Sequence, residues 1–248
     1  MINSKRSKDL ISLNEPNSFI AESYKMFRTN INYLNINGKN QVLMLTSSMS
    51  EEGKTTTICN LAVTMAKDNK KVLLIECDLR RPRVHELFKV NQIPGLTNII
   101  YDNLILSEII QRVDNVDGLD ILTSGVIPLQ ASELLNSAAF KNIIQDARNL
   151  YDVILIDTPP LLSVTDAAII SLLVDGVILT VAANQTKKSV ISKSYKVLNN
   201  INSNVLGVVL TKMDNKKHNK YYNDSYYNLN NKYKPRNWIQ KLMKRAFK

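Results

Sequence analysis

The hydrophobic pattern of the chain alternates between short apolar runs and longer segments with helical periodicity. The apolar runs are typical of strands buried on both faces and lie at residues 42–46, 71–77, 119–123, 151–157, 176–181 and 205–211. Segments with an apolar residue every three or four positions are predicted helices and lie at residues 19–34, 55–68, 83–88, 96–101, 107–113, 131–150 and 186–201. This alternation predicts an α/β fold with a doubly wound, mostly parallel sheet over residues 41–211.

The two ends of the chain lack this pattern. Residues 1–18 are polar and are expected to form a poorly ordered arm, after which Ser18 is placed to cap the first helix. Residues 215–237 contain seven Asn and almost no aliphatic side chain, so they are expected to bury no core and to be mobile. The predicted organisation is an arm with an oligomerisation helix (1–40), a P-loop domain (41–211) and a basic, tyrosine-rich tail (212–248).

The stretch QVLMLTSSMSEEGKTTT, residues 41–57, predicts a strand, a turn and a helix. Backbone N–H groups at the helix start can bind phosphate, together with the ammonium of Lys54, and the hydroxyl of Thr55 can bind Mg²⁺. The motif is an imperfect P-loop, because Ser48 stands where the first Gly is expected and only Gly53 remains. The nucleotide-contacting residues predicted here are Ser48, Met49, Ser50, Glu51, Glu52, Gly53, Lys54, Thr55 and Thr56.

Charged residues follow two of the other predicted strands. Glu76, Asp78, Arg80 and Arg81 come at the end of the second strand, where open α/β sheets bind their ligands. A carboxylate there can hold Mg²⁺-bound water or accept a hydroxyl proton, and an arginine can neutralise a transferring phosphate. A salt-bridge cluster with a purely structural role is the alternative.

The run YDVILIDTPP, residues 151–160, is a Walker B pattern. Four apolar residues lead into Asp157, which is placed to reach a metal, and the two prolines fix the exit turn. Asp166 follows nine residues later and is expected to line the same crevice or to cap a helix.

The cysteines and the lengths of the apolar runs indicate the cellular compartment. Cys59 and Cys77 lie inside a predicted helix and a predicted strand, which favours buried thiols and a reducing, cytoplasmic environment. No apolar run approaches the ~20 residues of a membrane span, and the first residues lack the apolar core of a signal peptide. The chain is therefore predicted to be neither secreted nor membrane-spanning.

The net charge of +10 is concentrated at one end. Residues 212–248 hold eleven Lys/Arg against two Asp, a net charge of +9, which leaves +1 for the preceding 211 residues. This distribution argues against a nucleic-acid-binding face and favours a basic tail that meets an acidic surface. Residues 238–248 separate apolar from basic side chains at helical spacing, which predicts a short amphipathic helix that binds a membrane surface, its own domain or a partner.

With these motifs in hand, the sequence resembles the bacterial tyrosine kinases of capsule and exopolysaccharide systems. EEGKTT resembles their Walker A, LLIECDLRRP their second motif and LIDTPP their Walker B. Glu22, Lys25 and Arg28 resemble the family's E-x-x-R-x-x-R oligomer helix, with Lys replacing the first Arg; a solvated charge stripe is the alternative. The family's C-terminal tyrosine cluster is similar to Tyr221, Tyr222, Tyr226, Tyr227 and Tyr233.

The resemblance implies a kinase that transfers phosphate from ATP to tail tyrosines of a neighbouring subunit in a ring. It implies that Lys54 binds the β/γ-phosphates, that Thr55, Asp157 and Asp78 serve Mg²⁺ or the acceptor, and that Glu76 and Arg80 complete the catalytic set. The resemblance also places Thr211 on the family's base-recognition strand, as a nucleotide contact. The implied partners are a transmembrane activator of the polysaccharide co-polymerase type on a separate chain and a cognate tyrosine phosphatase, at the inner face of the cell membrane.

The chain departs from the family pattern in three places. Ser50 and Glu51 stand where Pro-Gly is usual, Glu76 replaces the first Asp of the second motif, and Thr211 replaces a frequent Asn. Two other functions are therefore considered. A partitioning or cell-division ATPase would usually carry a second lysine early in the P-loop, which Ser48-Met49 does not offer, and a non-catalytic scaffold of the export machine would fit the altered motifs.

Overall fold

A seven-stranded sheet forms the centre of the protein. The computed structural model describes residues 9–34 and 41–213, and the sheet has the strand order β3-β4-β2-β5-β1-β6-β7. All neighbouring strands are parallel except the antiparallel pair β3–β4. The strands are β1 (Val42–Ser47), β2 (Val72–Glu76), β3 (Gln111–Arg112), β4 (Leu119–Leu122), β5 (Val153–Asp157), β6 (Gly176–Ala182) and β7 (Val205–Thr211).

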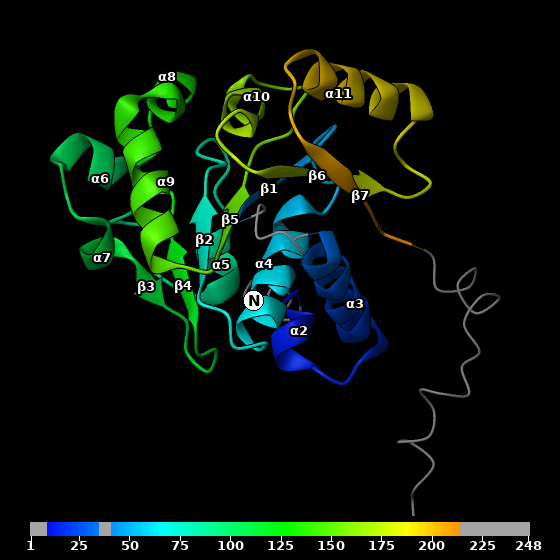
Figure 1. Cartoon of the computed structure of the whole chain (residues 1–248), viewed down its shortest axis with the longest axis horizontal. Helices are drawn as coiled ribbons and strands as arrows, with labels where there is room; N and C mark the ends of the chain where they lie inside the picture. Colours follow the sequence, from blue (N-terminus) through cyan, green and yellow to red (C-terminus); the bar gives the residue numbers. More distant parts are fainter. Residues whose placement is uncertain (1–8, 35–40, 214–248) are drawn as a thin grey trace, which may run out of the picture. The chain divides into compact units, whose positions relative to one another are not determined.

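Helices cover both faces of the sheet (Figure 1). One face packs against α2 (Ile11–Asn14), α3 (Phe19–Leu34), α4 (Lys54–Ala66) and α5 (Val84–Phe88). The other face packs against α6 (Leu96–Asp102), α7 (Leu106–Ile109), α8 (Ala131–Asn136), α9 (Ala138–Leu150), α10 (Asp166–Ser171) and α11 (Lys188–Asn200). None of these helices is long and apolar enough to cross a membrane.

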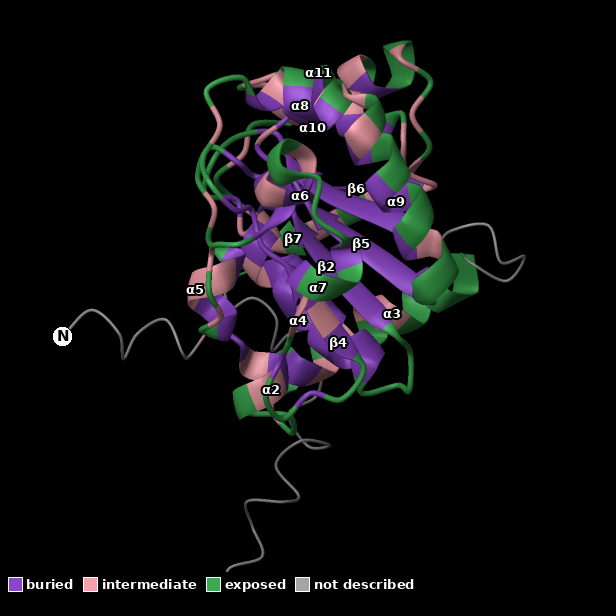
Figure 2. Ribbon diagram, turned by 90° about the vertical axis from the view of Figure 1, so that its left-hand side faces the viewer, coloured by how far each residue is buried: buried purple, intermediate pink, exposed green. Residues whose placement is uncertain are grey.

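Burial on both faces explains the continuous apolar runs of the central strands. Every residue of β1, β2, β5 and β6 is buried, and Figure 2 shows β2, β5 and β6 in purple. In β1, Val42 and Met44 enter the core beneath the α6–α11 side, whereas Leu43 and Leu45 enter the core beneath α4. The prediction of a doubly wound, mostly parallel α/β sheet is confirmed.

Local patterns placed several elements correctly. The first long helix spans Phe19–Leu34, and Ser18 Oγ accepts a hydrogen bond from Ala21 N at 3.2 Å, as expected of a capping serine. The last strand has the predicted limits, Val205–Thr211. The predicted domain limits remain predictions, and the tyrosine-rich tail lies outside the described residues.

Two predicted helices differ from the structure. The single helix expected over 131–150 is two helices in the structure. The break occurs because Ser137 takes an extended conformation and caps α9, where its hydroxyl accepts a hydrogen bond from Phe140 N. The helix expected over 107–113 ends at Ile109, and the next residues pair with β4 as β3. Both breaks come from local hydrogen bonds that apolar periodicity does not report.

Residues 9–18 of the N-terminal arm are also more ordered than expected. Within it, α2 packs on α4, and Leu10 and Ser12 are buried. Ser12 N donates to Asn60 Oδ1 at 2.8 Å, and Lys67 Nζ donates to Ser12 O at 2.8 Å. These partners lie more than 45 residues away in sequence, so a local reading of polarity misses them.

Candidate active site

The carboxyl ends of three central strands meet at one edge of the sheet. β5 lies between β2 and β1, and Asp157 is in register with both Glu76 and Leu45. The loops that follow these strands therefore converge, as the topology of an open parallel sheet requires. The exit loop of β5 is also tied to β1, since Leu161 N donates to Ser47 O at 2.8 Å.

The loop between β1 and α4 has the shape of a phosphate-binding loop. It leads into α4, a helix of 13 residues, and Gly53 at its start has φ +86°. Glu51 also lies in the left-handed region, with φ +63°. That conformation favours glycine, so Glu51 occupies it at a cost in conformational energy.

Buried polar contacts hold this loop from behind. The Glu52 carboxylate is buried and accepts hydrogen bonds from Met49 N, at 2.8 Å, and from the hydroxyl of Thr186. Thr211 Oγ1 donates to the Glu52 carbonyl oxygen at 2.6 Å. Glu52 and Thr211, predicted as nucleotide contacts, thus support the loop in this structure.

Ser48 and Met49 are not among the residues that line the cavity beside the loop. Ser48 is buried, and its hydroxyl accepts a hydrogen bond from Ser194 Oγ at 2.8 Å. Met49 is about half exposed, at 49%. The loop residues that line the cavity are Ser50, Glu51, Gly53, Lys54, Thr55 and Thr56.

Four predicted catalytic and metal-binding residues come together at the start of α4. Lys54 Nζ lies 2.8 Å from Asp78 Oδ2 and 3.7 Å from Asp157 Oδ1. Thr55 Oγ1 donates to Asp157 Oδ2 at 2.7 Å and accepts from Lys54 Nζ at 3.2 Å. The structure therefore joins the ends of β1, β2 and β5 in one charged cluster.

Burial and charge shift two pKa values in this cluster. Burial opposes the charged form of Lys54, but attraction by Asp157 and Asp78 prevails and raises its pKa above the usual value. Burial raises the pKa of Asp157 to about 6, although the nearby Lys54 ammonium acts in the opposite direction. Each ion depends on the other for compensation in the low-dielectric interior.

The cluster fits a Mg²⁺ ion of the kind that accompanies nucleotides. Asp157 Oδ1 is buried and has no hydrogen-bond partner among the described residues, so it retains a free acceptor. Mg²⁺ in phosphate-transfer sites uses one or two carboxylates and completes its shell with phosphate and water. A hydroxyl from Thr55 and a carboxylate from Asp157 match this pattern.

A cavity of about 400 Å³ opens beside the cluster. Besides the phosphate-loop residues it is lined by Asp78 and three arginines, Arg80, Arg81 and Arg83. The segment that follows β5 contributes Pro159, Pro160, Ser163 and Val164 to the lining. A lining that combines charged and apolar residues suits a ligand with a phosphate and an aromatic side chain.

Glu76, predicted to be catalytic, accepts hydrogen bonds from backbone N–H groups in this structure. Its buried carboxylate accepts hydrogen bonds from Arg83 N, from Val84 N at 2.5 Å and from Ser124 N at 3.2 Å. His85 Nδ1 lies 3.7 Å from the same carboxylate. These contacts make Glu76 a positioning residue for the loop after β2.

Arg80 is anchored by residues from two other elements. Its Nε and Nη2 donate to the buried Asp166 carboxylate at 2.9 and 3.1 Å. Ser132 Oγ donates to the same carboxylate at 2.5 Å, and Thr165 Oγ1 donates to Ser132 Oγ at 3.1 Å. The sequence singled out Asp166 but not Thr165, which carries no motif of its own.

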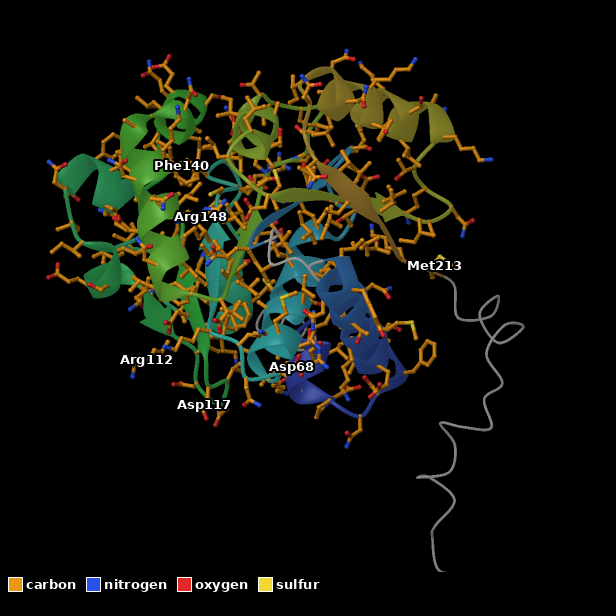
Figure 3. The ribbon with its side chains drawn as sticks, in the orientation of Figure 1. Asp68, Arg112, Asp117, Phe140, Arg148 and Met213 are labelled. Carbon is orange, nitrogen blue, oxygen red and sulfur yellow. The ribbon has the colours of Figure 1, made fainter. Side chains whose placement is uncertain are left out.

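The predicted oligomer residues lie on α3, away from the cavity. Lys25 pairs with Glu22 at 2.5 Å. Arg28 Nη1 donates to Thr64 O at 2.9 Å and lies 3.6 Å from Asp68, which Figure 3 labels. Arg28 therefore contacts α4 of its own chain, and the role of these residues in an oligomer remains a prediction.

Comparison with known proteins gives consistent matches over most of the chain. A family model described as an AAA domain matches residues 41–210. Tyrosine-protein kinase YwqD of Bacillus subtilis is 37% identical over 218 residues, which cover 88% of this chain and 92% of that protein. The putative tyrosine-protein kinase CapB of Staphylococcus aureus is 36% identical over 208 residues, which cover 84% of this chain and 91% of that protein.

Solved structures give the same picture. The chimerical protein CapA2B2 has a TM-score of 0.79 and 32% identity, covering 83% of this chain and 90% of that chain. The kinase domain of the Escherichia coli tyrosine kinase ETK has a TM-score of 0.78 and 29% identity, covering 83% of this chain and 82% of that chain. The septum site-determining protein MinD of Pyrococcus horikoshii has a TM-score of 0.58 and 21% identity, covers 73% of this chain and 76% of that chain, and shares the fold alone.

Proposed function

The chain belongs to the tyrosine-protein kinase family of these relatives, and from that membership we propose that it is an ATP-dependent autokinase acting on the tyrosine cluster of a neighbouring copy. The observation that carries the proposal is the contact of Lys54 and Thr55 with Asp78 and Asp157 beside the cavity. Phosphoryl transfer requires positioning and charge neutralisation more than a covalent catalyst. The cluster is suited to both tasks.

In the proposed reaction the phosphate loop binds ATP, and Lys54 contacts its β- and γ-phosphates. Lys54 then turns from Asp78 toward the phosphates, which leaves the Asp78 carboxylate able to accept the proton of the tyrosine hydroxyl. The tyrosine oxygen bonds to the γ-phosphorus as the bond from that phosphorus to ADP breaks. Thr55 and Asp157 would hold Mg²⁺, which supplies neutralisation of the phosphate charge.

Glu76 and Arg80 support this reaction in two different ways. Glu76 fixes the backbone after β2 and so sets the position of Asp78 two residues on. Arg80 uses Nε and Nη2 to bind Asp166, and its Nη1 has no hydrogen bond to any described residue. That nitrogen is suited to neutralising charge on the transferring phosphate.

The proposed setting follows the family. The kinase forms a homo-oligomer, with Glu22, Lys25 and Arg28 on α3 as contact residues, and acts with a transmembrane co-polymerase-type activator on a separate chain. A cognate tyrosine phosphatase reverses the reaction. In this role the kinase regulates capsular or exopolysaccharide synthesis and export from the inner face of the cell membrane, and it does not bind nucleic acid.

The test mixes two variants with ATP, Mg²⁺ and the cytoplasmic segment of the activator. Lys54→Met removes the phosphate-binding ammonium but keeps the tail, and the second chain keeps Lys54 but has its five tail tyrosines changed to Phe. Phosphotyrosine on the Lys54→Met chain, detected only in the mixture, is the expected result of transfer between subunits. Neither variant is expected to be phosphorylated alone.

Lys141→Met is the matched control, because Lys141 is an exposed lysine of α9 outside the cavity lining. It should retain full phosphotyrosine formation. Absence of phosphotyrosine in the wild-type chain with activator present would contradict the proposal and favour a non-catalytic scaffold. Release of inorganic phosphate without phosphotyrosine would favour an ATPase of the partitioning or division type.

A further inference from the structure

Two arginines of the cavity lining have no ion pair with an acid in the described part of the chain: Arg81 and Arg83. The other two cations of the lining are compensated, since Lys54 contacts Asp78 and Arg80 contacts Asp166. Arg81 and Arg83 are both exposed. The cavity lining thus holds two arginines without an ion pair to a described acid, next to the cluster proposed to transfer phosphate.

The backbone beneath these two arginines is fixed by buried carboxylates. Arg81 N donates to Asp78 Oδ1 at 3.1 Å, and Arg83 N donates to Glu76 Oε1. Pro82 between them has a φ angle restricted by its ring. The two guanidinium groups therefore project from a rigid turn but are free to bind an anion.

We propose that Arg81 and Arg83 bind the phosphate of a tyrosine that is already phosphorylated, while its neighbour in the sequence occupies the acceptor position. The inference rests on the proposed transfer to the tail. Guanidinium groups bind phosphate through two parallel hydrogen bonds, which suits a phosphotyrosine dianion. The tail contains two tyrosine pairs, Tyr221–Tyr222 and Tyr226–Tyr227, whose Cα atoms are about 3.8 Å apart within each pair.

The charge of the tail segment makes its binding to the two arginines depend on phosphorylation. The first pair follows Lys216, Lys217 and Lys220, so an unmodified acceptor segment brings positive charge toward two free arginines. Each phosphate adds about −1.5 to −2 and replaces repulsion by attraction. Phosphorylation of the first tyrosine then promotes phosphorylation of the others.

The binding test uses the full chain with its five tail tyrosines changed to Phe, so that its own tail offers no phosphate. Three fluorescent peptides spanning residues 219–233 are compared by anisotropy: one unphosphorylated, one phosphorylated at Tyr227, and one unphosphorylated but matched in charge by two added Glu. The chain is expected to bind the phosphopeptide about tenfold more tightly than either of the others. Arg81→Gln/Arg83→Gln in this chain should abolish that preference, and Arg81→Gln alone should reduce it by about threefold.

A nucleotide phosphate is the other source of the same chemistry, and a fluorescent ATP analogue distinguishes the two. The double variant should bind the analogue within about twofold of the parent chain. A parallel loss of analogue affinity would assign the arginines to ATP and overturn the proposal, as would equal affinity of the parent chain for all three peptides.

Arg112→Gln is the matched control. Arg112 is an exposed arginine on the edge strand β3, outside the cavity lining, and is labelled in Figure 3. It should leave the preference for the phosphopeptide intact, and its loss in this variant would show that the preference reflects general surface charge. Because binding is read without phosphoryl transfer, failure of this test is distinguishable from failure of the kinase assay.

Discussion

At the scale of single residues, Glu51 is the position where sequence and structure disagree most about the phosphate loop. The loop requires a left-handed backbone there, with φ +63°, which glycine adopts without steric cost. For a residue with a Cβ, this left-handed conformation costs about 1 kcal/mol or more of conformational free energy. Glu51 also lines the cavity in which phosphates are proposed to bind.

Glu51→Gly is therefore expected to stabilise the protein by about 1 kcal/mol and to tighten binding of an ATP analogue severalfold. Both effects follow from removal of the strained side chain and its negative charge. Urea unfolding measures the free energy of unfolding, and analogue fluorescence measures affinity. Glu51→Ala is the control, because it removes the charge but keeps the Cβ, so it should improve affinity without the gain in stability. Weaker analogue binding by Glu51→Gly would refute this account of the loop.

At the scale of elements, Asp175 joins three segments that are far apart in sequence. It precedes β6, and its Oδ2 accepts hydrogen bonds from Gln41 N at 2.9 Å and Val42 N at 2.7 Å, at the start of β1. Arg148 of α9 binds the same carboxylate through both Nη atoms, at 2.6 and 2.8 Å. Burial opposes the charged form of Asp175, but these hydrogen bonds outweigh it and lower its pKa.

A carboxyl group with a lowered pKa in the folded state stabilises the fold above its unfolded pKa of about 3.9, and the contribution disappears as pH falls through the folded value. Asp175→Asn should therefore cost about 2 kcal/mol of unfolding free energy at pH 7, and the difference from wild type should shrink below about pH 4. Urea unfolding at pH 7, 4 and 2.5 measures this difference. Arg148, labelled on α9 in Figure 3, would keep its charge in the variant but lose its partner.

Asp117→Asn is the control for this series. Asp117 is exposed in the turn before β4 and forms no ion pair with another described residue. Its replacement should change the unfolding free energy little at any of the three pH values. A constant deficit of Asp175→Asn down to the lowest pH would show that the loss comes from packing and not from the charged carboxylate.

At the scale of the whole molecule, charge is divided between a nearly neutral domain and a strongly basic tail. Residues 212–248 carry +9, and five phosphotyrosines at about −1.5 to −2 each would add roughly −8 to −10. Phosphorylation would thus cancel the charge through which the tail is proposed to bind acidic lipid. The tail was proposed above as a kinase substrate, and the same modification would then also control membrane attachment.

Unmodified protein is expected to co-sediment with liposomes containing acidic lipid, and fully phosphorylated protein to remain largely in the supernatant. The five-Tyr→Phe chain, incubated with ATP under the same conditions, is the control and should sediment like unmodified protein. Neutral liposomes should retain neither form. Equal sedimentation of the phosphorylated and unmodified proteins would rule out the electrostatic switch.

The sequence alone determined the fold class, most elements and three motifs of the site. These features depend on local information: the period of apolar residues, the placement of Gly and Pro, and the position of a charged residue directly after a strand. For that reason β7, the α3 cap at Ser18 and the positions of Lys54, Asp78 and Asp157 were predictable. The break at Ser137 was not, because apolar periodicity continues across it.

Tertiary structure alone decided which of these residues line the cavity and which hold the loops around it in place. Glu76 and Glu52 appear equivalent to catalytic or nucleotide-binding acids in the sequence, but their carboxylates accept backbone N–H groups or a distant hydroxyl. Arg80 meets Asp166 from 86 residues away, and Thr211 meets Glu52 from 159 residues away. Such pairs depend on the order of strands in the sheet, which brings distant strand ends together and which no local pattern encodes.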